Sequence, residues 1–126
     1  MKITEGKHPK TALFVLVATL ALAALPAVAQ DPVKLAPDHI KVVLENDRVR
    51  VLDDRSKPGD KEGLHSHPAC IIHVLTGGKI RSTSPDGKVT VAELKAGDTL
   101  WREPLTHSVE NIGTTELHLL LVELKK

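Results

Sequence analysis

The chain has 126 residues, a formal net charge of +1, and only one tryptophan, one phenylalanine and one cysteine. A nearly neutral charge and so few aromatic residues argue against a nucleic-acid-binding surface, which needs basic patches and stacking platforms. A single cysteine excludes an internal disulfide. It leaves a free thiol, an intermolecular bridge, a metal ligand or a small buried apolar residue as the roles of that side chain.

The first 29 residues have the pattern of a secretory signal peptide. A basic start with three lysines precedes an apolar run over residues 12–25, and Pro26 ends that run. Ala27-Val28-Ala29 then supplies the small residues of a cleavage site. A membrane anchor that stays in place is the alternative, but the run is shorter than the ~20 residues that span a bilayer. We therefore expect cleavage after Ala29, no stable membrane insertion afterwards, and a periplasmic or secreted protein of 97 residues (126 − 29).

The rest of the chain predicts one all-β domain behind a short arm. Residues 30–39 contain Pro32 and Pro37 and predict an extended arm without a helix. Residues 40–126 alternate apolar and polar side chains between turn signals, and residues 54–63 form a polar loop. About eight short strands of this kind are typical of a sandwich or a closed barrel. They are predicted at 40–45, 48–53, 70–76, 79–83, 89–94, 99–102, 106–112 and 115–124.

Three histidines form the candidate metal site. His65 and His67 are two residues apart, so on a β-strand both imidazoles point to the same face. A divalent ion needs at least three donors from different parts of the chain, and His107 supplies the third. The alternatives are a solvent-exposed pair in a loop and a strand histidine with a hydrogen-bonded ring. Cys70 is the candidate fourth ligand, and an inert buried thiol is its alternative.

The spacing of these residues resembles the two motifs of the cupin family. Gly59, five residues, His65, one residue and His67 match the opening of the first motif, and His107 followed by Asn111 matches the end of the second. The resemblance covers residues 42–124. It implies a small single-domain cupin, with a double-stranded β-helix or jelly-roll barrel over residues 40–126 and a divalent metal ion on the three histidines. It also implies a homodimer, which the apolar residues on both faces of the last strand support.

The chain departs from the cupin motifs at two places. The first motif normally supplies a glutamate ligand where this chain has Ile71 or Ile72, and Cys70 is the nearest substitute. The second motif, which begins at Gly97-Asp98, is one residue short and lacks the usual P-x-G turn. Three neutral imidazoles leave Fe, Mn, Cu, Zn and Ni open and favour an anionic ligand, whereas a Cys70 thiolate would shift the preference to Zn or Cu.

Other polar residues are assigned more ordinary places. If Cys70 faces inward, strand parity turns His73 outward. His118 is expected to be a hydrogen-bonded core histidine and His39 a surface residue. Four basic residues are expected on a solvated outer face, with Arg81 also within reach of a cavity: Arg48, Arg50, Lys79 and Arg81. Three acidic residues near the expected mouth of the barrel have either an acid–base role or none: Glu62, Glu103 and Glu110.

The function expected from these features is that of an exported metal-binding cupin. Cupins with three histidines include non-haem iron dioxygenases, isomerases and proteins that only hold a ligand or an ion, so the fold does not decide the activity. One hypothesis is a metal-dependent oxygenase-type or isomerase-type enzyme acting on a small anionic or apolar molecule. The alternative is a non-catalytic barrel that binds a metal or small ligand, and a structural barrel without an ion is the third. The expected partners are a small molecule and a second copy of the chain.

Overall fold

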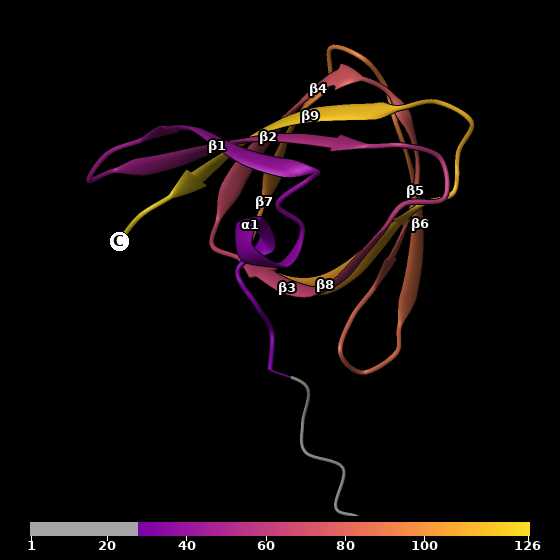
Figure 1. The fold of residues 1–126 in the computed structure, drawn as a ribbon, viewed down its shortest axis with the longest axis horizontal. Coiled ribbons are helices and arrows are strands. Elements are labelled where there is room, and N and C mark those ends of the chain that lie inside the picture. The colour runs from indigo at the N-terminus through magenta and orange to yellow at the C-terminus, as the bar shows by residue number, and fades with distance from the viewer. Residues whose placement is uncertain (1–27) are drawn as a thin grey trace, which may run out of the picture.

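The computed structural model describes residues 28–126, as one helical turn and nine strands (Figure 1). The predicted signal peptide lies outside the described residues except for Val28 and Ala29. No helix in the described part of the chain is both long and apolar enough to cross a membrane. The elements are α1 (Pro32–Leu35), β1 (Ile40–Glu45), β2 (Val49–Ser56), β3 (Lys61–His67), β4 (Cys70–Thr76), β5 (Gly78–Thr83), β6 (Val89–Leu94), β7 (Thr99–Arg102), β8 (Leu105–Asn111) and β9 (Leu117–Leu124).

The strands form two sheets that face each other across one interior. The five-stranded sheet has the order β1-β2-β9-β4-β7 and the four-stranded sheet the order β3-β8-β5-β6. Figure 1 shows β2, β4 and β9 along one side of the interior and β3 and β8 along the other. All pairs of neighbouring strands are antiparallel. The all-β fold predicted from the alternation is therefore confirmed.

The apolar core follows the alternation of the strands. In β9, Leu117, Leu119 and Leu121 are buried, while the side chains between them lie on the outer face of the five-stranded sheet. Burial on one face and partial exposure on the other is the pattern of an antiparallel sheet that covers a core. The core is completed from both sheets by Ile40, Leu52, Val74, Ile80 and Leu94.

Two sequence predictions about the first part of the domain are wrong. The arm contains the helical turn α1, because the Asp31 carboxylate accepts hydrogen bonds from two backbone N–H groups and Pro32 suits the first turn. The predicted polar loop over 54–63 contains the end of β2 and the start of β3. β2 continues because Asp54 and Ser56 point into the interior, on the same side as Leu52.

Arg50 also differs from its predicted place on a solvated face. It pairs in register with Glu123 of β9, and both side chains point inward. Its guanidinium bonds the Glu123 carboxylate at 2.8 Å and the Asp31 carboxylate at 2.7 Å. A half-buried arginine is stable here because two carboxylates neutralise its charge.

A β-bulge interrupts the pairing of β3 with β8. Glu62 pairs with Val109 and His65 with His107, so three steps along β3 match two along β8. In a regular strand, residues three apart point to opposite faces. The extra residue turns Glu62 and His65 to the same, inner face, where both are buried.

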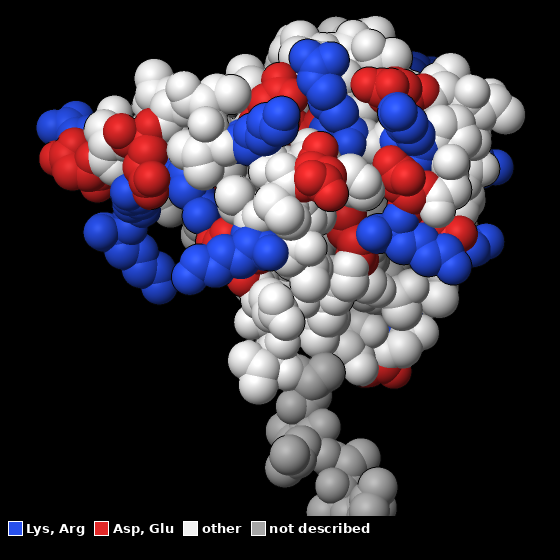
Figure 2. All heavy atoms as spheres, in the orientation of Figure 1, with Lys and Arg blue, Asp and Glu red and all other residues white. Residues whose placement is uncertain are grey.

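The outer surface carries mixed charge. Lysine and arginine side chains alternate with aspartate and glutamate over the face shown in Figure 2. On the four-stranded sheet, Arg81 bonds Glu110 at 3.0 Å, so both take the surface role that the sequence analysis allowed. Paired charges of this kind give that face no strong field of one sign.

Candidate metal centre

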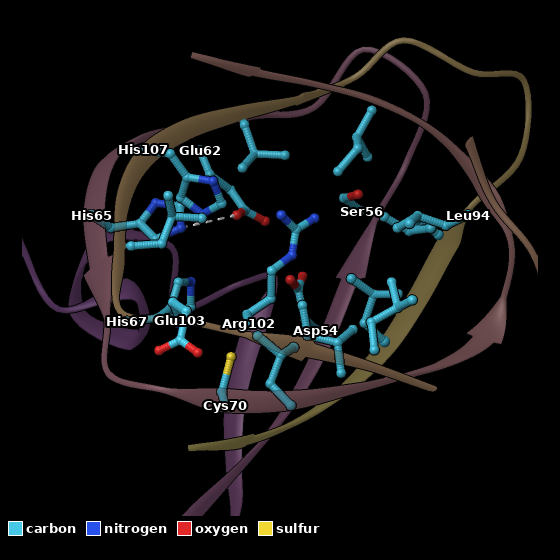
Figure 3. A pocket seen from close by; sticks show the side chains of 18 residues that line it. Asp54, Ser56, Glu62, His65, His67, Cys70, Leu94, Arg102, Glu103 and His107 are labelled. Atoms are coloured by element: carbon cyan, nitrogen blue, oxygen red, sulfur yellow. Dashed lines mark ion pairs between the residues drawn. The ribbon is translucent and has the colours of Figure 1, made fainter. Parts of the chain in front are cut away.

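The imidazoles of His65, His67 and His107 meet at one end of the interior (Figure 3). β3 and β8 are neighbours, so His65 lies directly opposite His107, and His67 follows on the same face. The ring centroid of His65 lies 4.7 Å from that of His107 and 4.9 Å from that of His67. The centroids of His67 and His107 are 5.6 Å apart. One potential ligand atom from each residue lies within 4.8 Å of the other two. The structure thus brings together the three histidines that the sequence singled out.

Each of the three rings is held through its Nδ1 atom. His65 Nδ1 bonds the Gly63 carbonyl oxygen at 2.7 Å, and His67 Nδ1 bonds Glu123 Oε1 at 2.8 Å. His107 Nδ1 bonds Ser82 Oγ at 2.9 Å. The Gly63 carbonyl and the Glu123 carboxylate accept at Nδ1, which favours the tautomers of His65 and His67 in which Nε2 carries the lone pair, the usual arrangement around a metal-binding histidine. The Ser82 hydroxyl can accept from His107 Nδ1 in the same way or donate to it.

Burial favours the neutral form of His65 and His107, as metal binding requires. Burial lowers the pKa of His65, and the positive charge that His67 can carry adds to this effect. Burial lowers the pKa of His107 to about 3, with further contributions from His65, His67 and Arg102. Three neutral nitrogen donors from two strands form a set that suits Fe, Mn, Co, Ni, Cu or Zn in the divalent state. The residues present therefore fit a metal ion.

A buried network of charged side chains holds the Nδ1 side of the His67 ring. Glu123 is only 2% exposed and places one carboxylate oxygen on the His67 ring and the other on Arg50. Arg50 also donates a hydrogen bond to the carboxylate of Asp31, the residue that caps α1. Carboxylates behind ligand histidines orient the ring and raise its basicity. The network therefore ties the orientation of His67 to the N-terminal arm.

A cavity of about 60 Å³ adjoins the three histidines. One part of its wall is apolar, with Ile72, Leu100 and Leu105. The polar part of the wall, shown in Figure 3, includes Asp54, Ser56, Glu62, Cys70, Arg102 and Glu103.

Asp54 and Glu62 form a buried carboxyl pair in this cavity. The two side chains share a hydrogen bond, which requires a proton on one of them. Burial raises the pKa of Asp54, and burial together with the Asp54 charge raises the pKa of Glu62. Glu62 Oε2 also lies 4.0 Å from His65 Nε2. Glu62 is therefore a buried residue of the cavity wall and not an ordinary surface charge.

Cys70 lies in the same cavity but apart from the three histidines. Its side chain is 2% exposed, and Figure 3 shows its sulfur pointing into the cavity. Among the described residues, the group with donor atoms within 4.8 Å of one another contains the three histidines and not Cys70. Burial, with a contribution from Glu123, raises the pKa of the thiol to about 11. Its role as a fourth ligand stays a prediction.

The other histidines lie away from the cavity wall. The outward direction predicted for His73 is confirmed, and its ring bonds Thr99 Oγ1 at 2.9 Å. His118 bonds Asp53 Oδ2 at 2.7 Å, so it is satisfied as predicted, but on the half-buried outer face of the sheet. His39 Nε2 lies 3.4 Å from Asp60 Oδ2.

Sequence reasoning missed three charged residues of the site: Asp54, Arg102 and Glu123. Strand parity would have found them, because Asp54 follows Leu52 by two residues and Glu123 follows Leu121 by two. Arg102 likewise follows Leu100, and both line the cavity. Asp54 falls in the predicted polar loop, and Arg102 and Glu123 have no predicted role, although the alternation turns all three side chains inward.

Comparison with solved structures shows which fold this is. A cupin domain from Bordetella pertussis Tohama I is 29% identical, over 69% of this chain and 92% of that chain, with a TM-score of 0.64. A Klebsiella pneumoniae protein with a double-stranded β-helix domain is 28% identical, over 68% and 74%, with a TM-score of 0.55. An RmlC-like cupin from Methanocaldococcus jannaschii is 14% identical, over 68% and 77%, with a TM-score of 0.55.

Comparisons with family models and with curated proteins gave no match. The similarity to solved structures agrees with the two facing sheets and with the motif spacing around His65, His67 and His107. The Bordetella and Klebsiella proteins, both above 25% identity, are a cupin domain and a protein with a double-stranded β-helix domain. The chain belongs to the cupin superfamily, as a small protein with a double-stranded β-helix domain.

Proposed function

We propose that this protein is an exported cupin that binds one divalent transition-metal ion through the Nε2 atoms of His65, His67 and His107. The observation that carries the proposal is that one potential ligand atom from each of the three rings lies within 4.8 Å of the other two, while every Nδ1 atom is already hydrogen-bonded and Nε2 is left for a ligand. Packing alone does not require three histidine rings to direct their unbonded nitrogens to one point, whereas a metal site does.

The metal would supply Lewis-acid chemistry to a small molecule in the adjoining cavity. The enzyme proposed is of the non-haem metal-dependent oxygenase type or the isomerase type, and the identity of the metal is open among Fe, Mn, Cu, Zn and Ni. A cavity beside the histidines supports a ligand-binding role. A barrel that binds the metal or a small ligand without turnover is the alternative.

The metal proposal is tested by elemental analysis of the mature protein purified without a histidine tag. We expect about one equivalent of a transition metal in the wild type and a loss of it in His107→Ala. His118→Ala is the matched control, because this histidine lies on the outer face of the sheet with Asp53. Metal retained in His107→Ala, or lost equally in both variants, would contradict the proposal.

Turnover is tested separately, by oxygen uptake with small thiols, diketones and phenols. Uptake that depends on the metal and disappears in His107→Ala supports the oxygenase. A metal-loaded protein with no uptake and no isomerisation supports the binding barrel.

The proposed fourth ligand is tested with Cys70→Ser. If Cys70 binds, the variant should lose Zn or Cu affinity relative to the wild type, since the soft sulfur donor is removed. Unchanged metal content and affinity in Cys70→Ser would restrict the site to the three histidines.

A further inference from the structure

Arg102 is a cationic side chain that points into the cavity of the metal centre. It lies at the end of β7, directly opposite Cys70 on β4, and the side chains of both residues line the cavity. Figure 3 shows its guanidinium group projecting toward the middle of the cavity. Its positive charge is also close enough to the histidines to contribute to the lowered pKa of His107.

Arg102 differs from the other inward or paired arginines in having no partner in the described part of the chain. Arg50 bonds Glu123 and Asp31, and the guanidinium of Arg55 bonds Asp53 at 3.0 Å. No carboxylate of the described residues lies within 4.0 Å of the Arg102 guanidinium, and no side-chain hydrogen bond forms there. A half-buried guanidinium with free N–H groups in a cavity is a preformed site for an anion, because its planar fork matches a carboxylate.

The acidic residues of the same wall are already engaged. Asp54 and Glu62 share a hydrogen bond and a proton, and the Glu103 carboxylate accepts a hydrogen bond of 2.7 Å from the Trp101 indole. The Asp54–Glu62 pair keeps one negative charge, and Arg102 is the cationic side chain of this wall that has no ion-pair partner among the described residues.

The cavity has room for a small anion beside Arg102. A volume of about 60 Å³ is enough for about four to six atoms, if each needs the ~10–15 Å³ that a water molecule requires. The adjoining apolar wall, with Ile72 and Leu100, suits a short hydrocarbon part. A carboxylate of two or three carbon atoms matches these dimensions.

We propose that Arg102 binds the carboxylate group of a small organic acid of two or three carbon atoms, held in the cavity beside the metal. This inference rests on the proposed metal centre, and it names the ligand class that the centre would accept. Three neutral imidazoles leave the charge of the ion uncompensated, so the cavity holds two positive centres for an anion.

The test uses the Co(II)-loaded protein and acetate. Its visible spectrum reports the metal first, and titration with acetate at constant ionic strength then gives the dissociation constant of the anion. Arg102→Gln should bind Co(II) like the wild type and bind acetate about 10-fold or more weakly, because one charged hydrogen-bonding partner is lost. Arg102→Lys keeps the charge but loses the planar fork, so its acetate affinity should lie between those of the wild type and Arg102→Gln.

Arg81→Gln is the matched control, because it removes an arginine that is paired with Glu110 outside the cavity. It should leave the acetate affinity unchanged. Equal affinities in wild type and Arg102→Gln, with Co(II) bound in both, would overturn the role of Arg102 and leave the metal centre standing. Absence of Co(II) binding by the wild type would overturn the metal centre itself. Arg102→Met, of similar length, replaces Arg102→Gln if the latter does not fold.

Discussion

Glu123 is the residue on which most of the buried polar network depends. It is the acceptor for His67 and the counter-charge for Arg50, at 2.8 Å in both cases. A buried carboxylate with two such partners is stable only while both remain. The ring of His67 is therefore positioned by a residue that does not itself face the shared point of the three histidines.

Replacing Glu123 by glutamine tests this positioning role. Glu123→Gln keeps the size of the side chain but removes its charge, so we expect the metal affinity to fall about 10- to 100-fold. Competition with a chromogenic chelator measures the affinity. Glu110→Gln is the control, since this carboxylate pairs with Arg81 on the outside. An unchanged affinity in Glu123→Gln would show that the other contacts of His67 are sufficient.

The Asp54–Glu62 pair predicts a stability that falls with pH. The folded-state pKa of Glu62 is raised to about 8, above the ordinary glutamate value of 4.5, so between these values the folded protein binds more protons than the unfolded chain. Stability is therefore lost as the pH rises toward 8. Urea unfolding of the metal-free protein at pH 6.5 and pH 8.5 measures the change.

Glu62→Gln should remove much of this pH dependence and stabilise the protein at pH 8.5 by on the order of 1 kcal/mol. The comparison starts at pH 6.5 because His65 and His107, whose pKa values are lowered, become destabilising as the unfolded chain takes up protons below that pH. A variant with the same slope as the wild type would contradict a raised pKa for Glu62.

At the scale of the elements, Asn111 connects β8 to the rest of the fold. Its amide nitrogen donates to the carbonyl oxygens of Ser56 at 2.9 Å and Thr115 at 3.0 Å, and its side-chain oxygen accepts from Gly113 N–H at 3.0 Å. The side chain is 2% exposed. The residue that ends the second cupin motif thus holds the end of β2 and the loop between β8 and β9 against the end of β8.

Asn111→Ala should therefore cost stability and leave the metal stoichiometry intact. Three lost hydrogen bonds at about 1 kcal/mol each give an expected loss of about 3 kcal/mol. Asn46→Ala is the matched control, since Asn46 bonds two backbone N–H groups in an exposed turn. Urea unfolding compares the two variants, and equal losses would contradict a special role for Asn111.

The elements also show how far the sequence could predict this fold. Alternation located most strands, and the two-residue spacing of His65 and His67 placed both rings on one face because strand parity is a local property. The bulge in β3 could not be predicted, since it depends on the register with β8. The turn α1 has a local signal, the Asp31 cap followed by Pro32, but two prolines close together favoured an extended arm. Burial of Glu62 followed from that bulge and could not be read from local sequence.

At the scale of the whole molecule, an apolar row crosses the outer face of the five-stranded sheet. The register aligns one outward residue from each strand, in the order Leu44, Val51, Val122, Ile71 and Trp101. Ile71 is 37% exposed and Trp101 53%. A row of this length on an otherwise mixed surface is suited to a contact with a second copy of the chain, as the predicted homodimer requires.

Ile71→Lys is expected to convert the homodimer to a monomer, because it places a charge in the middle of this row. Sedimentation velocity gives the oligomeric state. Trp101 is the only tryptophan of the chain, so its fluorescence should also shift to longer wavelength in the variant. Val91→Lys, which alters an exposed valine of the other sheet, should stay dimeric. A monomeric wild type would exclude this interface.

The bulge in β3 also determines what a one-residue deletion in this strand would do to the site. Its extra residue brings the Gly63 carbonyl to the ring of His65, while Leu35 of the arm packs within 3.5 Å of where a Gly63 side chain would begin. Deleting Gly63 or Leu64 would leave Glu62 two residues before His65, so a regular ladder would still turn both inward. The acceptor that sets the tautomer of His65 would be displaced. Shortening the strand by one residue would thus keep the composition of the cavity wall and change only how one ring is oriented.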